Sequence, residues 1–251
     1  METQYKEYKA RKPKAPPISL LQVSGARSLV TSLDAFGPNS FNQNVAEMQK
    51  QYSHPDTGEI IRFIEPTSAE SILVASYDFA KRAKPKIFDP RWLQLGRIVR
   101  TSEGVYANVP KDAQGAPIAD EQVLKSFLKA DKKVNGIWLL DNDFGYAPYE
   151  TFVRGVQDGG DFAEGGLARV LEHTEKTAEN LKEIASKKNY SRGVNVWGFD
   201  SVNQPVLRVA SLDSSRYLAN RQLLVDGNNW LDYDDGFAFG VLDSAKGTAK
   251  K

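Results

Sequence analysis

The chain has 251 residues, 41% of them hydrophobic and 10% aromatic, which is enough to bury the core of one sizeable folded domain. Its 33 basic and 32 acidic residues give a formal net charge of +1, so the chain has no general attraction to nucleic acid or to an anionic membrane. Cysteine is absent, which excludes disulfide frameworks, thiolate zinc sites and cysteine-dependent catalysis.

The ends of the chain differ in composition from the rest. Residues 1–17 are basic and rich in proline, which predicts a flexible or extended arm. Residues 18–243 are expected to form one domain, and residues 244–251 a disordered tail. A docking tail for an acidic partner or nucleic acid is the alternative for the arm, because it carries Lys6, Lys9, Arg11, Lys12 and Lys14.

Targeting signals are not evident. No apolar run is long enough to span a membrane, and the first residues lack the apolar core of a signal peptide. We therefore expect a cytoplasmic location by default, while surface display by an unidentified route stays open.

The first part of the chain predicts short elements in an irregular order. Residues 26–35 indicate a short helix that stops at the Phe-Gly-Pro sequence of residues 36–38. A turn at residues 56–58 precedes a strand over residues 60–64.

The next stretch contains a helix and then a hairpin. Thr67 and Glu70 form a T-x-x-E capping box, and the apolar positions after it keep helical spacing until Pro85. Strands are expected over residues 93–100 and 105–109, joined by a Ser-Glu-Gly turn.

Helices end well before the C-terminus. An amphipathic helix is expected over residues 121–130, a strand over residues 134–142, and helical segments interrupted by glycines over residues 149–188. After Arg192 the pattern shows only short strands and glycine-punctuated loops. Helices before strands indicate an α+β fold with a short-stranded antiparallel sheet and N-terminal helical elaborations, not a parallel α/β sheet.

Groups that could perform catalysis are scarce. His54 lies in a turn and His173 near a helix end, and neither has a partner at metal-ligand spacing. The glycine-rich residues 158–166 lack the strand, the spacing and the Lys-Ser/Thr end of a phosphate loop. We therefore expect no enzyme activity, no cofactor and no metal, although calcium sites are loosely imitated by the acidic runs Asp141, Asp143 and Asp232, Asp234, Asp235.

Residues 208–242 combine a regular frame with side chains that share no chemical theme. Between Lys188 and Lys246 there is no Lys, Glu or Met. The frame contains Arg208, Arg216, Arg221, Leu223, Val225, Gly227, Trp230 and Phe237. The side chains that we predict to be interchangeable and to contact a ligand are Asp213, Ser215, Tyr217, Leu218, Ala219, Asn220, Leu224, Asp226, Asn228, Asn229, Leu231, Asp232, Tyr233 and Asp234.

Strand alternation separates these two sets. It places Leu223 and Val225 on one face of a strand, suited to a core, and Gln222, Leu224 and Asp226 on the other, suited to solvent. Exposed apolar and tyrosine side chains among short polar ones are typical of binding surfaces.

The frame residues are expected to support this surface. We expect Trp230 and Phe237 to anchor the loop from beneath. The guanidinium groups of Arg208, Arg216 and Arg221 are expected to bind backbone carbonyls or acidic side chains. These contacts would fix the loops while the neighbouring side chains vary.

The same segment resembles the variable region of proteins that are diversified by diversity-generating retroelements, and most of all the archaeal, Nanoarchaeota-type family. The resemblance covers about the final fifth of the chain. It is carried by R-V-A-S-L at residues 208–212, Arg216, the R-x-L-x-V-x-G frame at residues 221–227, Trp230 and G-F-A-F-G-V-L at residues 236–242.

The resemblance implies a C-type lectin fold and a ligand-binding protein whose specificity changes by mutation. In that family a reverse transcriptase copies a template repeat with errors at adenines, and the copy replaces the end of the gene. Randomised AAC or AAT codons never encode Lys, Glu, Gln, Met or Trp, so Gln222 is a departure. Gln204-Pro205-Val206 is only loosely similar to the three-residue sugar motif of calcium-dependent lectins, because it lacks the carboxylate.

The expected function is therefore binding of an unidentified protein or cell-surface ligand by a monomer, without nucleic acid. One alternative is a structural or virion-associated protein whose C-terminal loops pack against another subunit. A second is a hydrolase using Asp141, Asp143 or Asp232 as acid and base, which predicts a deep pocket with paired carboxylates.

Overall fold

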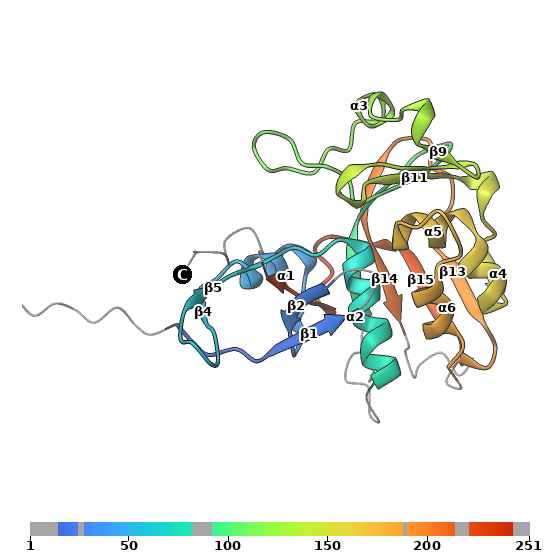
Figure 1. The fold of residues 1–251 in the computed structure, drawn as a ribbon. Helices are drawn as coiled ribbons and strands as arrows, with labels where there is room; N and C mark the ends of the chain where they lie inside the picture. Colours follow the sequence, from blue (N-terminus) through green and yellow to red (C-terminus); the bar gives the residue numbers. More distant parts are fainter. Residues whose placement is uncertain (1–14, 25–27, 82–91, 188–189, 214–220, 243–251) are drawn as a thin grey trace, which may run out of the picture.

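In the computed structural model of the chain, residues 15–24, 28–81, 92–187, 190–213 and 221–242 are described. They form a mixed α/β structure in which a large sheet and two smaller sheets are combined with several helices (Figure 1). Within these ranges, no helix is both long enough and apolar enough to cross a bilayer.

The helices are short except for the second. The α-helices are α1 (Phe41–Met48), α2 (Ser68–Lys81), α3 (Glu121–Ser126), α4 (Gly159–Glu164), α5 (Gly166–Glu172) and α6 (Glu179–Ala185). Single 3-10 turns are η1 (Ala130–Lys132), η2 (Asp141–Asp143) and η3 (Tyr149–Thr151).

The large sheet has 11 strands. Its main path runs in the order β12 (Gly155–Gln157), β13 (Val194–Trp197), β15 (Leu223–Asn229), β14 (Val206–Asp213), β7 (Trp92–Arg100), β8 (Gly104–Ala107), β11 (Gly145–Pro148), β10 (Ile137–Leu139) and β9 (Lys133–Val134). Off this path, β16 (Gly236–Ala238) pairs with β7 and with β3 (Phe36–Asn39).

Two small sheets accompany it. The four-stranded sheet has the order β1 (Leu20–Ser24), β2 (Ser28–Ser32), β17 (Val241–Leu242) and β6 (Phe63–Ile64), and the two-stranded sheet pairs β4 (Tyr52–Ser53) with β5 (Ile60–Ile61). The segment before α2 is thus built mainly of short strands. The expected N-terminal helical elaborations are reduced there to α1.

The large sheet is mixed and not purely antiparallel. Most neighbours are antiparallel, but β13 runs parallel to β15 and β16 runs parallel to β7. The central strands are also longer than expected, with 9 residues in β7 and 8 in β14. Their length allows one surface of the sheet to support several helices.

The main core lies between the central strands and helices α2, α4, α5 and α6 (Figure 1). Leu95 and Ile98 of β7 belong to this core, and so do Leu171 of α5 and Ile184 of α6; all four side chains are fully buried. The helical residues come from the glycine-interrupted stretch in which the sequence predicted helices. Their burial fixes the sheet against a rigid layer of helices.

Helix α1 packs elsewhere. Its Phe41 and Val45 form a separate small core with Val209 of β14. The amide of Asn44 donates hydrogen bonds to Gln94 Oε1 at 2.8 Å and to the Gly236 carbonyl at 2.9 Å. This helix therefore ties the N-terminal segment to the C-terminal strands.

Some local predictions are confirmed and one is wrong. In the predicted capping box, the Thr67 N–H donates to Glu70 Oε2 at 2.9 Å and the Glu70 N–H to Thr67 Oγ1 at 3.3 Å. The β7–β8 hairpin forms as expected. Residues 26–35, however, contain strand β2 and not a helix, because β2 pairs with β1 and β17. The hairpin with β1 and the long-range pairing with β17 together override the local preference.

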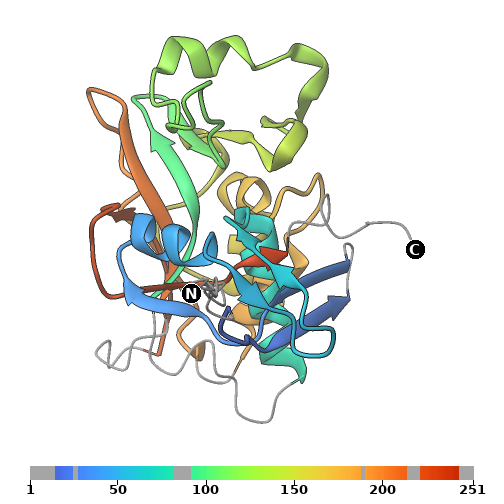
Figure 2. The same cartoon turned by 90° about the vertical axis from the view of Figure 1, so that its left-hand side faces the viewer.

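The segment between β8 and β11 stands apart from the small N-terminal sheets. It carries α3, η1, β9 and β10 and lies at one end of the molecule (Figures 1 and 2). The helix predicted over residues 121–130 ends earlier than expected, with Phe127 as its C-cap.

Candidate functional site

The predicted ligand-contacting residues divide by exposure. Asn228, Asp232, Tyr233 and Asp234 are exposed, and Leu231 is half-buried. We call residues 228 and 230–234, which are exposed or half-buried, the C-terminal rim. Ser215, Tyr217, Leu218, Ala219 and Asn220 lie outside the described residues, as does the frame residue Arg216.

The prediction of solvent exposure is wrong for the other four residues. Asp213 is 2% exposed, Asp226 4%, and Leu224 and Asn229 8% each. Strand β15 lies inside the sheet, between β13 and β14, and all its residues except Asn228 are buried, on both faces. Alternation assigns side chains to the two faces of a strand, but it does not say whether the second face is covered. These four side chains belong to the packed sheet.

Asp226 has a structural partner. Its Oδ1 accepts a hydrogen bond from the Asn228 N–H at 2.8 Å. Burial raises the pKa of the Asp226 carboxyl, while that hydrogen bond and the charge of Arg100 act in the opposite direction. A buried carboxyl that is hydrogen-bonded to its own strand cannot contact a ligand at the surface.

Arg100, which the sequence analysis did not single out, organises one end of the rim. It is 6% exposed and donates to the Gly198 carbonyl and to Asn228 Oδ1, the latter at 2.9 Å. Gly198 has φ +71, and a Cβ there would lie 2.6 Å from the Cβ of Asn228. The close approach therefore requires a glycine. In the sequence, the feature that could have indicated this role of Arg100 was its charge at the end of a predicted strand.

Trp230 does not anchor the loop from beneath, in contrast to the prediction. It is 56% exposed, and the guanidinium of Arg208 lies over its ring at 3.7 Å from the centroid. Burial lowers the pKa of Arg208, an effect reinforced by Arg100 and opposed by Asp232. Trp230 is instead a large, solvent-exposed aromatic side chain that stacks on the guanidinium of Arg208.

The backbone of the rim is fixed at both sides of this tryptophan. The Leu231 carbonyl accepts from the Phe41 N–H of α1 at 3.2 Å, and the Trp230 carbonyl accepts from the Tyr233 N–H at 3.3 Å. The Tyr233 ring lies 6.2 Å from the Trp92 ring, centroid to centroid, while the residue stays 50% exposed. The rim thus combines a constrained backbone with free side-chain surface.

The remaining frame residues differ from each other. Arg221 is exposed, with a left-handed φ of +49, so its side chain is not a buried fork as predicted. Its carbonyl accepts from the Arg192 N–H at 3.2 Å. Phe237 is half-buried on β16, between β7 and β3.

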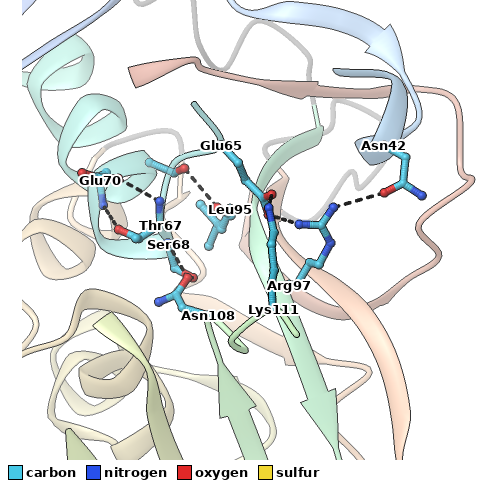
Figure 3. A network of polar contacts seen from close by, with 10 residues as sticks. Asn42, Glu65, Thr67, Ser68, Glu70, Leu95, Arg97, Asn108 and Lys111 are labelled. Atoms are coloured by element: carbon cyan, nitrogen blue, oxygen red, sulfur yellow. Dashed lines mark hydrogen bonds and ion pairs between the residues drawn. The ribbon is translucent and has the colours of Figure 1, made fainter. Parts of the chain in front are cut away.

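A cavity of about 610 Å³ shares none of its lining residues with the rim, and the sequence did not predict it. Glu65 at its wall forms ion pairs with Arg97 through Oε1 and with Lys111 through Oε2, the latter at 2.8 Å (Figure 3). Arg97 also donates to Asn42 Oδ1 at 3.2 Å. We call this cavity the polar cavity.

A hydrogen-bonded frame holds the polar cavity against α2. Asn108, with a left-handed φ of +52, accepts from the Ser68 N–H at 2.8 Å (Figure 3). Its side-chain amide donates to the Asp143 carbonyl at 2.9 Å. Asp143 Oδ2 accepts from Thr67 Oγ1 at 2.6 Å. In the sequence, the feature that could have indicated this site was an Asn directly after a strand, because Asn adopts a positive φ more readily than most residues.

The carboxylates of the hydrolase alternative do not gather in one pocket. Asp141 is exposed and lines the polar cavity, whereas Asp143 is buried and Asp232 belongs to the rim. His173 caps α5 in a left-handed conformation, with Nε2 2.7 Å from the Leu140 carbonyl and Nδ1 3.4 Å from Asp143 Oδ1.

The other reactive groups have local roles. His54 Nδ1 accepts from the Asp56 N–H at 3.2 Å in its turn. The glycine-rich residues 158–166 form α4 and the start of α5, with Asp158 as N-cap. Across the described part of the chain, no three His, Asp or Glu side chains are grouped as metal ligands.

Comparison with known proteins adds little. No protein-family model and no curated protein matches this sequence. A solved structure described as "Accommodation of massive sequence variation in Nanoarchaeota by the C-type lectin fold" matches with a TM-score of 0.46 and 15% identity, over 83% of this chain and 96% of that one. A likeness at this level shows neither a shared family nor a shared function.

Proposed function

We propose that this chain is a non-enzymatic binding protein with a C-type lectin fold, which recognises a protein or cell-surface ligand through side chains of its C-terminal rim. The proposal includes diversification of the rim by adenine-directed retroelement mutagenesis. The exposed members of the binding set are then Asn228, Trp230, Asp232, Tyr233 and Asp234.

One observation carries the proposal: exposed side chains of mixed chemistry stand on a constrained backbone. Two large aromatic side chains are half or more exposed within four residues of each other, at Trp230 and Tyr233. Aromatic side chains with few rotatable bonds give a large contact area at a low entropic cost, and short polar neighbours adapt their hydrogen bonds. Such a surface suits a macromolecular ligand better than a small one.

The constrained backbone explains why the rim tolerates change. The Phe41 N–H and the Arg208 guanidinium hold Leu231 and Trp230 without using the side chains of Asp232, Tyr233 or Asp234. Replacing those three side chains leaves these contacts in place. Binding is then expected with little movement of the backbone.

The first test is genetic. The DNA beside the gene should contain a near-identical repeat of the rim codons that differs only opposite adenines, together with a reverse transcriptase gene. Sibling proteins should differ at the exposed rim residues and share Arg100, Arg208 and Trp230. Siblings that vary equally at Val225 and Asp232 would contradict diversification.

The second test concerns binding itself. A display library randomised only at Asn228, Asp232, Tyr233 and Asp234 should yield binders to a fixed protein target, for which lysozyme serves as the probe. A matched library randomised at Glu121, Gln122, Lys125 and Lys129, on the α3 segment, provides the control. Equal yields from both libraries would overturn the assignment of the rim.

A subunit-interaction role has support of its own at the β12 border of the large sheet. Strand β12 is at the end of the strand order, and its Val156 is 61% exposed, as is Trp197 of the neighbouring β13. Exposed apolar residues beside a sheet edge are typical of protein contacts. A dimer mass in light scattering that Val156→Lys abolishes would favour this function.

A further inference from the structure

The polar cavity has the construction of a small-molecule site. We propose that it binds a small monocarboxylate with an apolar body, independently of the rim. Its volume of about 610 Å³ falls in the range of ligand pockets, and its wall combines charged groups with aromatic and aliphatic ones.

Charge at the wall favours an anion. Arg97 and Lys111 share the single carboxylate of Glu65, so this trio retains one positive charge. Lys129 adds a second cation, and Asp141 is the remaining carboxylate of the lining. The lining therefore has one positive charge in excess, which a monoanion would neutralise.

Arg97 makes this a site with a built polar wall. Its side chain is 9% exposed and lies with its guanidinium carbon 4.9 Å from the centre of the Phe41 ring. Its Nε is buried without a hydrogen-bond partner, although the neighbouring guanidinium nitrogens are bonded. Glu65 and Asn42 hold the other guanidinium nitrogens, so Arg97 is a fixed charged group in the wall of the cavity.

Apolar lining defines the body of the ligand. Phe127 and Phe144 meet edge to face with ring centres 5.9 Å apart. Phe127 is 36% exposed although it lines the cavity, and Leu140 and Val109 extend the apolar wall. An aromatic or aliphatic group beside the carboxylate would cover these side chains.

The loop that closes the cavity is held in an unusual conformation. Asn142 and Asp143 are consecutive residues with left-handed φ values of +57 and +59. Asn and Asp adopt this conformation more readily than other non-glycine residues, and residues held in it are frequent at binding sites. Here Thr67, Asn108 and His173 enforce it through their contacts with Asp143.

The experiment is an amide NMR titration of the full chain with 3-phenylpropionate. The neutral 3-phenylpropionamide controls for charge, and acetate controls for the apolar body. We expect shift changes at residues 108–111 and 140–144, with the amide and acetate each at least about tenfold weaker, because each lacks one of the two matched features.

Two variants sharpen the assignment. Lys129→Gln should weaken 3-phenylpropionate binding about tenfold, while Lys132→Gln, an exposed lysine outside the lining, should leave it unchanged. The proposal is overturned if the amide binds as well as the carboxylate, if the shifts map elsewhere, or if millimolar 3-phenylpropionate causes none. None of these outcomes bears on binding at the rim.

Discussion

The C-terminal rim and the β14–β15 ladder are adjacent in sequence and opposite in character. In the rim, side chains such as Asp232 and Tyr233 reach solvent from a backbone that other residues hold. In the ladder, Leu224 and Asn229 are buried, although they look equally arbitrary in the sequence. A mixture of unrelated side chains along a strand therefore does not show that they are exposed. Whether they reach solvent depends on whether the second face of the strand is covered.

The largest effect that separates the two regions comes from placing the same charge in each. Leu224→Asp introduces an unpaired carboxylate into the packed sheet and should lower the free energy of unfolding by about 3–5 kcal/mol. Tyr233→Asp, at a residue that is 50% exposed, should cost no more than about 1 kcal/mol, mainly from the lost contact with Trp92. Urea unfolding of both variants measures the difference, and equal costs would show that Leu224 is not buried.

Two neighbouring asparagines offer a finer comparison. Asn229 donates from Nδ2 to Ser211 Oγ at 2.5 Å inside the sheet, so Asn229→Ala strands a buried hydroxyl and should cost about 1–3 kcal/mol. Asn228→Ala should cost less than about 1 kcal/mol, because Arg100 keeps the Gly198 carbonyl as acceptor. Chemical unfolding should show a larger loss of stability for Asn229→Ala than for Asn228→Ala. The reverse order would mean that the border between the rim and the packed sheet does not lie between these two residues.

Local signals in the sequence predicted local structure well. The capping box at Thr67 and the hairpin between β7 and β8 depend on residues close together in the chain, and both formed as expected. The helix predicted over residues 26–35 failed because β2 pairs with β1 in a hairpin and, on its other side, with β17 about two hundred residues away. Pairing over that separation leaves no local pattern.

The candidate sites show the same limit. Alternation correctly assigned Leu223 and Val225 to the core. It could not show that β15 is covered on its second face, nor that Trp230 lies beyond the end of that strand. The polar cavity was missed because Glu65, Arg97 and Lys111 meet only in the folded chain. Contacts of this kind follow from tertiary packing and not from spacing.

A smaller effect is expected where the rim meets its support. Arg208→Ala removes the guanidinium from the Trp230 ring and should cost about 0.5–1 kcal/mol, because the pair is partly exposed. Arg192→Ala serves as the control, because Arg192 is exposed and its hydrogen bond to the Arg221 carbonyl comes from the backbone N–H. Tryptophan fluorescence should change with the first variant only. An unchanged spectrum for Arg208→Ala would mean that the stacking does not fix Trp230.

The rim carboxylates should matter least for stability near neutral pH. The double variant Asp232→Ser, Asp234→Ser changes two exposed side chains and should alter the free energy of unfolding by no more than about 0.5 kcal/mol. Thermal unfolding at matched ionic strength checks this. A loss of several degrees in Tm would remove the basis for free substitution in the rim.

The last comparison is a dependence on pH, carried by Asp226 of the ladder. Burial raises the pKa of this carboxyl in the folded state above its unfolded value of about 3.9. Between those two pKa values the folded state binds more protons than the unfolded state, so stability falls as the pH rises through this window. Asp226→Asn does not titrate and retains an Oδ1 acceptor for the Asn228 N–H. Relative to wild type, the variant should therefore gain stability from about pH 3.5 upward and level off above the folded pKa, as urea midpoints at each pH will show. Parallel curves would mean that the carboxyl is solvated, and β15 would then expose the face on which alternation had placed its variable side chains.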